Sequence, residues 1–573
     1  MYIIPVPQKI SAEKEKIKLS SFSLKTDNEA IKKFASDFDC NGDLTISFSK
    51  TENDNPEYYT LTVDDGKIEI EYVTDEGAFR AYTTLKQIIR QAEDNEIPKL
   101  EIEDFPSLKN RGYMLDVSRG KIPKYSELIR VVDYMADLKY NQLQLYLDSF
   151  AIEYKNFPEY CKDTMPITKE ELMSLKEYCK SKYITMIPNQ NSLGHMAAWT
   201  AKPELSHLAI SNKDGGPSQT LNPLLPGSFE LIEKIYDGYF DSFEAPFANI
   251  GMDEPVDLGK FETKEECDKR GIGEVYTDYL KKVCTLVTEK YKKTPMFWDD
   301  IIFKHPEQIK NVPKNAIVME WGYEQEHHFD RNCRTLKDNG LRFYVCPGSS
   351  GWGSITGRSD NALFNITAAA ECGAYYGAEG FLLTEWGDDG CPQFNSITYI
   401  PLAIGGAASW NCMSHSTETA HETRKELLFA AKSYVNDNIF KAKGTEFAEI
   451  VYRMGKYYTV EENFRFSGTD LYHFTKETYC LRERHKPLYL YVYDYMAELR
   501  ERLVKIDADE LCKKEVLLDC DIVLALCRAI SCPHDEENNK YIDKLCEDFG
   551  ELWKVRNHPI GYDIWPKIMQ SRK

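Results

Sequence analysis

The sequence predicts an α/β protein: a (β/α)8 TIM barrel preceded by a small α+β domain and followed by a helical C-terminal region. This prediction of the fold class rests on the spacing of apolar residues, which changes twice along the chain. Apolar residues alternate as in half-buried strands over residues 1–105, recur as short buried runs between helical stretches over 106–420, and have helical spacing over 421–573. A chain of 573 residues is also too long for one compact core, so several domains are expected.

The N-terminal domain contains three segments that alternate with a period of two, which predicts strands: 44–50, 58–65 and 67–73. Residues 76–92 follow with the spacing of an amphipathic helix. The segment 103–112, which contains a proline and a glycine, is the expected linker to the next domain.

The middle of the chain contains eight short apolar runs separated by helical stretches such as 125–139 and 274–291. The runs are 111–118, 141–148, 183–190, 247–254, 294–300, 316–322, 341–347 and 380–387. This alternation is typical of βα repeats, and eight of them predict a closed barrel whose functional groups lie at the C-terminal strand ends.

Helical spacing in 422–440, 489–506 and 513–530 predicts the C-terminal helical region. These helices could brace the barrel, or they could pair two copies of the chain as a homodimer.

A formal net charge of -21, with no basic stripe, argues against nucleic acid and anionic membranes as partners. The N-terminus lacks the pattern of a secretory signal and no apolar run is long enough to span a membrane, so a cytoplasmic location is expected. The 16 cysteines are scattered without paired spacing, which favours free thiols.

Two adjacent carboxylates, Asp253 and Glu254, end the fourth apolar run just before Pro255. Neighbouring side chains on a regular strand point to opposite faces, so both can line one pocket only if the strand bends at its exit. Because two close carboxylates resist simultaneous ionisation, the pair is expected to keep one proton near neutral pH. General acid catalysis on a glycosidic oxygen needs such a proton.

Three tryptophans, Trp298, Trp321 and Trp386, each end a different predicted strand. Three indoles from separate strands can converge on one cavity and enclose a small apolar group. Ordinary core packing is the alternative interpretation for any one of them.

The sequence resembles family 20 glycoside hydrolases, the β-N-acetylhexosaminidases. Five motifs carry the resemblance in order: YIIPVPQKI, EGAFRAYTTLKQII, RGYMLDVSR, NSLGHM and NIGMDE. It implies an exo-acting retaining enzyme that releases terminal β-linked GlcNAc, GalNAc or both from a glycan. No metal or other cofactor is implied.

The resemblance also implies roles for single residues. Glu254 would be the general acid/base, while Asp253 would orient the substrate's acetamido group, which attacks the anomeric carbon to give an oxazolinium. The substrate-binding residues implied are Trp298, Trp321 and Trp386 around the acetamide methyl, Arg119 and Asp388 at the sugar hydroxyls, and His195 beside the catalytic acid.

The sequence departs from the family pattern at two places, the first of which predicts a divergent branch and the second of which leaves the acetamide carbonyl without an assigned partner. Asn249 stands where many members have histidine, and the strand-seven loop, CPGSSGWGSITG, lacks the usual acetamide-binding tyrosine. Trp352 in that loop, Tyr323 or Tyr375 could bind the acetamide carbonyl instead. Trp352 is also expected to be an exposed platform for a sugar ring.

Three other functions compete with this interpretation. A metal-dependent barrel hydrolase could recruit His195, His207, His327 and His328, but no HxH follows the first strand and no HExxH occurs. A catalytically silent carbohydrate-binding barrel would have no use for the proton donor. Other acetamido-assisted glycosidases, including those that act on protein-linked sugars, usually carry paired aspartates. The choice between GlcNAc and GalNAc stays open.

Overall fold

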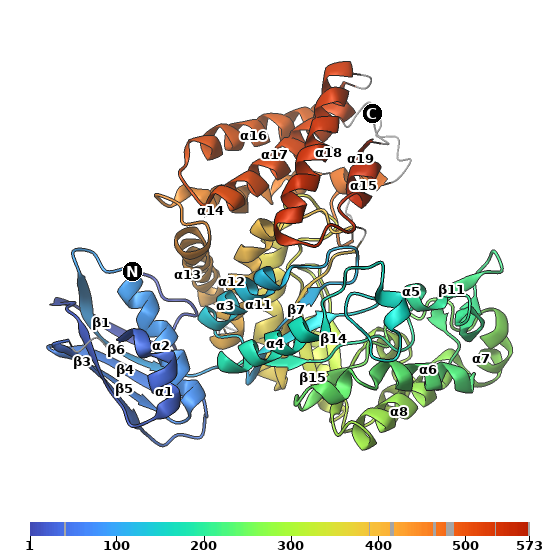
Figure 1. Ribbon diagram of the computed structural model, residues 1–573, viewed down its shortest axis with the longest axis horizontal. Coiled ribbons are helices and arrows are strands. Elements are labelled where there is room, and N and C mark those ends of the chain that lie inside the picture. Colours follow the sequence, from blue (N-terminus) through green and yellow to red (C-terminus); the bar gives the residue numbers. More distant parts are fainter. Residues whose placement is uncertain are drawn as a thin grey trace.

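The computed structural model describes residues 1–38, 42–388, 390–412, 417–461, 466–476, 486–532 and 535–570. Figure 1 shows the sheet of the N-terminal part, the barrel, and the C-terminal helices as three bodies in the predicted order along the chain.

The N-terminal sheet has six strands in the order β1-β6-β4-β5-β3-β2, and α2 packs on β4 and β5. Its elements are β1 Lys9–Lys18, β2 Phe22–Lys25, α1 Glu29–Phe34, β3 Leu44–Lys50, β4 Tyr59–Asp64, β5 Lys67–Tyr72, α2 Asp75–Arg90 and β6 Glu96–Asp104. The predicted strands and helix are therefore present as β3, β4, β5 and α2. Strand β1 escaped prediction because all but one of its side chains are exposed, so it shows no apolar alternation.

The barrel is an eight-stranded sheet in the order β12-β13-β14-β15-β16-β7-β8-β9, with every pair parallel. Its strands are β7 Asn110–Asp116, β8 Gln142–Tyr146, β9 Thr185–Ile187, β12 Phe247–Asn249, β13 Thr294–Trp298, β14 Ile317–Trp321, β15 Arg342–Cys346 and β16 Gly380–Glu385. All eight predicted strands are confirmed. The linker before them is shorter than expected, since only 105–109 separate β6 from β7.

The barrel closes at Asn249. Its backbone N–H donates to Pro188 O (2.9 Å), and Gln190 N–H donates to Asn249 O (3.0 Å), which joins β12 to the end of β9. The Asn249 side chain also holds the chain beyond the strand, because its Oδ1 accepts from Gly251 N–H at 3.0 Å.

Helices between the strands cover the outside of the barrel. They are α3 Tyr125–Asp137, α4 Lys169–Ser181, α6 Pro226–Tyr236, α8 Ile272–Glu289, α10 Phe329–Asp338, α11 Ser359–Tyr376 and α12 Asn395–Trp410. The loop after β9 carries a short hairpin, β10 Ala209–Ser211 and β11 Pro217–Leu221, which the sequence did not predict.

The C-terminal region is helical, as predicted, and Figure 1 shows it packed along one side of the barrel. Its helices are α13 Thr417–Tyr434, α14 Glu446–Met454, α15 Asp470–Lys476, α16 Lys486–Lys505, α17 Glu510–Ser531, α18 Glu536–Arg556 and α19 Ile564–Gln570. Buried Arg556 ties this region to the barrel, because its guanidinium contacts Glu127 of α3 at 3.0 Å and Glu515 of α17 at 2.6 Å.

The described cysteines are free thiols, and most of them are buried. None of the described helices combines the length and apolarity needed to cross a lipid bilayer.

A second buried ion pair ties the N-terminal sheet to the barrel. Lys139, just after α3, lies 2.7 Å from Asp104 at the end of β6, and neither side chain is exposed. Trp410 of α12 completes the cluster: its indole N–H donates to the second Asp104 oxygen at 2.8 Å, and the Lys139 ammonium lies 4.2 Å from its ring centre.

We expect Lys139→Met to lower the free energy of unfolding by about 3 kcal/mol, because it leaves the Asp104 carboxylate buried without its cation. Lys9→Met is the matched control, since Lys9 lies 2.8 Å from Glu103 on the exposed face of the same sheet. Denaturant unfolding should show almost no change for the control. Equal losses for the two variants would contradict the prediction.

Candidate active site

Both carboxylates of the predicted pair line one cavity because β12 turns sharply where it ends. Gly251 (φ +67°), Met252 (φ +78°) and Glu254 (φ +45°) all adopt the left-handed conformation within four positions. A Cβ on Gly251 would lie 1.7 Å from Asn191 Oδ1, so this turn requires glycine. The strand bend expected from the sequence is therefore present, and Asp253 and Glu254 face the same space.

The loop 192–196 packs directly against this turn. Gly194 makes the contact possible, since a Cβ there would lie 2.0 Å from the Asp253 carbonyl oxygen. His195, itself left-handed (φ +54°), then places its imidazole between the two carboxylates. Its Nε2 lies 3.3 Å from Asp253 Oδ2 and 3.4 Å from Glu254 Oε2.

The imidazole changes the charge state of the pair. Burial by itself lowers the pKa of His195, but the carboxylates of Asp253 and Glu254 outweigh it and raise this pKa to about 10. In turn, the hydrogen bond from His195 lowers the pKa of Glu254 against the opposing effect of burial.

This arrangement corrects the expectation that repulsion within the pair keeps one carboxylate protonated. The raised pKa belongs to His195, and the pKa of Glu254 is lowered rather than raised. The resemblance placed His195 beside the catalytic acid, but the sequence could not show how close the imidazole lies to both carboxylates.

The three predicted tryptophans line the same cavity, at the ends of β13, β14 and β16. Trp298 and Trp386 are buried, and their ring centres lie 5.9 Å apart at an angle of 50°. Tyr323 joins them, since its ring centre lies 5.1 Å from that of Trp321 and 6.4 Å from that of Trp386. The wall is therefore an aromatic cage of three indoles and one phenol.

Trp352 also lines the cavity, but the expectation of an exposed platform is wrong, because only 1% of its surface is exposed. Its indole packs edge-on to Tyr323 (5.1 Å, 88°) and close over Gly348, where a Cβ would lie 2.3 Å from the ring. Of the two tyrosines considered for the acetamide carbonyl, Tyr323 lies in the cage. Tyr375 is 61% exposed on α11 and does not line the cavity.

Arg119 and Asp388 occupy another side of the cavity and lie 3.2 Å apart. Arg119 is held from behind by Asp116 (3.0 Å) and Asp148 (3.4 Å). Its guanidinium also stacks 5.1 Å from the ring centre of Trp386. A guanidinium fixed on one side and a half-exposed carboxylate on the other provide donors and acceptors suited to sugar hydroxyls.

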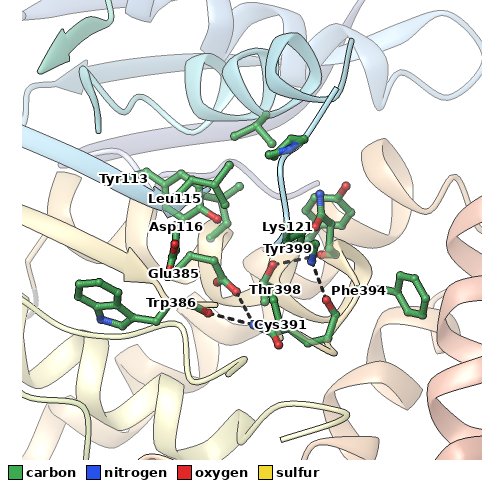
Figure 2. Close-up of a pocket in the computed structure, with 15 residues that line it drawn as sticks. Tyr113, Leu115, Asp116, Lys121, Glu385, Trp386, Cys391, Phe394, Thr398 and Tyr399 are labelled. Carbon is green, nitrogen blue, oxygen red and sulfur yellow. Dashed lines mark hydrogen bonds between the residues drawn. The ribbon is translucent and has the colours of Figure 1, made fainter. Parts of the chain in front are cut away.

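The end of β16 is fixed from below by a buried polar cluster. Figure 2 shows the Trp386 indole and the Glu385 carboxyl leaving the strand end in different directions. The Glu385 carboxyl accepts a hydrogen bond from the Gln393 side-chain amide at 3.5 Å. The Gln393 side-chain amide donates to Trp386 O at 3.1 Å, and Lys121 Nζ donates to Gln393 O at 2.7 Å. Burial raises the pKa of Glu385 to about 7.

Every residue that the sequence assigned to the site thus lines one cavity of about 220 Å³. The structure adds Phe466 and Ser467 to its walls, and of the two candidate tyrosines it brings Tyr323 into the cavity. Phe466 and Ser467 belong to the C-terminal region, and no signal in the sequence connects them to the barrel.

No group of three or more His, Cys, Asp or Glu side chains in the described ranges is arranged to hold a metal ion. Two of the four histidines considered for a metal site have other contacts: His195 lies between the carboxylates, and His327 Nε2 lies 2.7 Å from Glu320 Oε1.

Comparison with known families assigns the chain. Residues 109–351 match the catalytic domain of glycosyl hydrolase family 20, and residues 1–105 match domain 2 of the same family. The chain therefore belongs to glycoside hydrolase family 20. Trp352, Trp386 and Asp388 lie beyond the matched part of the catalytic domain.

Curated relatives include a probable beta-hexosaminidase of Arthroderma benhamiae, 24% identical over 56% of this chain and 58% of that protein. The alpha subunit of beta-hexosaminidase from Rattus norvegicus is 24% identical over 50% of this chain and 57% of its own length. The chain thus spans just over half the length of these relatives.

Solved structures agree in fold. The chitobiase of Flavobacterium johnsoniae superimposes with a TM-score of 0.60 at 18% identity and covers 99% of both chains. A mutant β-hexosaminidase of Streptomyces plicatus, solved with GlcNAc, gives a TM-score of 0.59 at 17% identity over 76% of this chain and 94% of its own.

The raised pKa of His195 predicts a pH-dependent contribution to stability. Because its pKa is about 10 in the folded chain and near 6.5 ordinarily, the contribution is complete below pH 6.5 and is lost as pH rises toward 10. The gap in unfolding temperature between the wild type and His195→Gln should therefore shrink from about pH 7 to about pH 10. Calorimetry showing a constant or widening gap would contradict the assignment.

Proposed function

We propose that the chain is an exo-acting, retaining β-N-acetylhexosaminidase that releases terminal β-linked GlcNAc, GalNAc or both. The observation that carries this proposal is the meeting of the Asp253–Glu254 pair with the aromatic cage in one cavity of about 220 Å³. A space of this size suits a single sugar ring with its acetamido group, which is what an exo-acting enzyme needs to enclose.

In this proposal Glu254 donates a proton to the glycosidic oxygen and later takes one from water. The pKa of its carboxylate is lowered in the free protein, so Glu254 must gain a proton when the substrate binds. A bound sugar displaces water from the half-exposed Glu254 side chain, which raises its pKa. The His195 imidazolium, 3.4 Å away, is the nearest source of the proton.

Asp253 is assigned to the acetamido N–H. One of its oxygens contacts His195, while the other is buried and has no hydrogen-bond partner in the described structure. A buried carboxylate oxygen without a donor is costly, and a substrate amide would supply the missing one. The negative charge beside that amide then stabilises the oxazolinium, so the substrate's own carbonyl oxygen is the nucleophile.

The remaining groups bind the sugar. Trp298, Trp321 and Trp386 enclose the acetamide methyl, and we assign the hydroxyl of Tyr323 to its carbonyl because Tyr323 is the phenol within the cage. Arg119 and Asp388 bind the outer hydroxyls.

The direct test uses an aryl N-acetyl-β-glucosaminide as substrate. The wild type should release the aryl group, and Glu254→Gln should lose about 100-fold to 10,000-fold in kcat for poor leaving groups, which depend most on the acid. Asp253→Asn should also lose activity, and added azide should not restore it, because no protein nucleophile has been removed. Asp257→Asn, close in sequence but outside the cavity, is the control.

Two outcomes would overturn this function. Binding of GlcNAc without any turnover of the aryl glycoside would favour the catalytically silent barrel. Rescue of Asp253→Asn by azide would show that Asp253 is itself the nucleophile.

A further inference from the structure

The C-terminal region reaches the cavity through a short segment, residues 466–469, which we call the strap. Phe466 and Ser467 line the cavity beside residues of the barrel. Phe466 is 64% exposed although it lines the cavity, and most phenylalanines are largely buried. Among the described residues of the C-terminal region, those of the strap are therefore placed to contact a substrate bound in this cavity.

The strap is fixed to the loops that carry Tyr323 and Trp352. Ser467 N–H donates to Glu324 Oε1 at 2.7 Å, and Glu324 is held in a two-pronged ion pair with Arg358 (2.7 and 3.1 Å). Thr469 N–H donates to Gly353 O at 2.9 Å. Gly353 is needed at this contact, since a Cβ there would lie 2.1 Å from the Ser467 carbonyl oxygen.

These anchors place Phe466 relative to the reacting groups. Glu324 follows Trp321 and Tyr323 at the end of β14, and Gly353 follows Trp352. The exposed fraction rises from 1% at Trp298 to 64% at Phe466, and the Glu254 side chain is intermediate at 47%. Trp298 of the cage thus lies at the closed end of the cavity and Phe466 at its mouth, and the Glu254 side chain is also open to solvent.

We infer that Phe466 is the platform for the leaving-group sugar, so that the C-terminal region selects glycans in which a second pyranose follows the cleaved bond. This rests on the proposed function, which places the released sugar in the cage and the glycosidic oxygen at Glu254. The leaving group must then lie toward the mouth. The C–H face of a pyranose packs on an exposed aromatic ring, whereas a small alcohol or a flexible peptide offers no matching flat face.

The experiment compares two substrates that share the cleaved sugar. One is the β-linked GlcNAc disaccharide, and the other is methyl β-N-acetylglucosaminide, whose leaving group has no ring. Phe466→Ala should lower kcat/KM for the disaccharide about tenfold and leave the methyl glycoside within about twofold, because stacking is lost only for the former. Phe466→Trp should keep the preference of the wild type.

Phe429→Ala is the matched control, since Phe429 is also in the C-terminal region, is 62% exposed and does not line the cavity. It should change neither rate. Equal losses on both substrates with Phe466→Ala, or no loss on the disaccharide, would overturn the inference. A wild type that cleaves neither substrate would instead overturn the proposed function, and the inference with it.

Discussion

Gly251, Met252 and Glu254 hold the left-handed conformation just past β12, and the site depends on this turn. On a regular strand Asp253 and Glu254 would point to opposite faces, and only one could reach the cavity. Left-handed backbone is costly for residues other than glycine, so surrounding contacts must hold it. The Asn249 side chain and the loop 192–196 provide these contacts, and both lie next to the place where β9 and β12 close the barrel.

His195 depends on the same turn. Its imidazole meets two carboxylates that the backbone has brought to one side, and it compensates their charge within a buried space. The pKa of His195 is raised and that of Glu254 is lowered, so the imidazolium and the Glu254 carboxylate stabilise each other. In the proposed function, a substrate that excludes water from Glu254 raises the pKa of this carboxyl, which links binding to its protonation.

The fold and most of the cavity could be predicted because strand ends in a barrel converge. Trp298, Trp321 and Trp386 belong to strands far apart in the sequence, yet the βα repeat places their ends on one rim. The features that the sequence did not predict depend on tertiary contacts, which the βα repeat does not specify. Trp352 is buried because it packs on Gly348 and Tyr323. Phe466 lines the cavity because of where the helical region packs against the barrel, which the sequence does not show.

We propose that the substrate's acetamide, oriented by Asp253, replaces a protein nucleophile. Stepwise fluorination of the N-acetyl methyl withdraws electrons from the carbonyl oxygen and weakens it as a nucleophile, while the leaving group stays the same. The measurement is kcat/KM for aryl N-acyl-β-glucosaminides carrying none to three fluorines. We expect a steep, continuous fall in kcat/KM along the series, and rates that do not respond to fluorination would contradict a nucleophilic role for the acetamide.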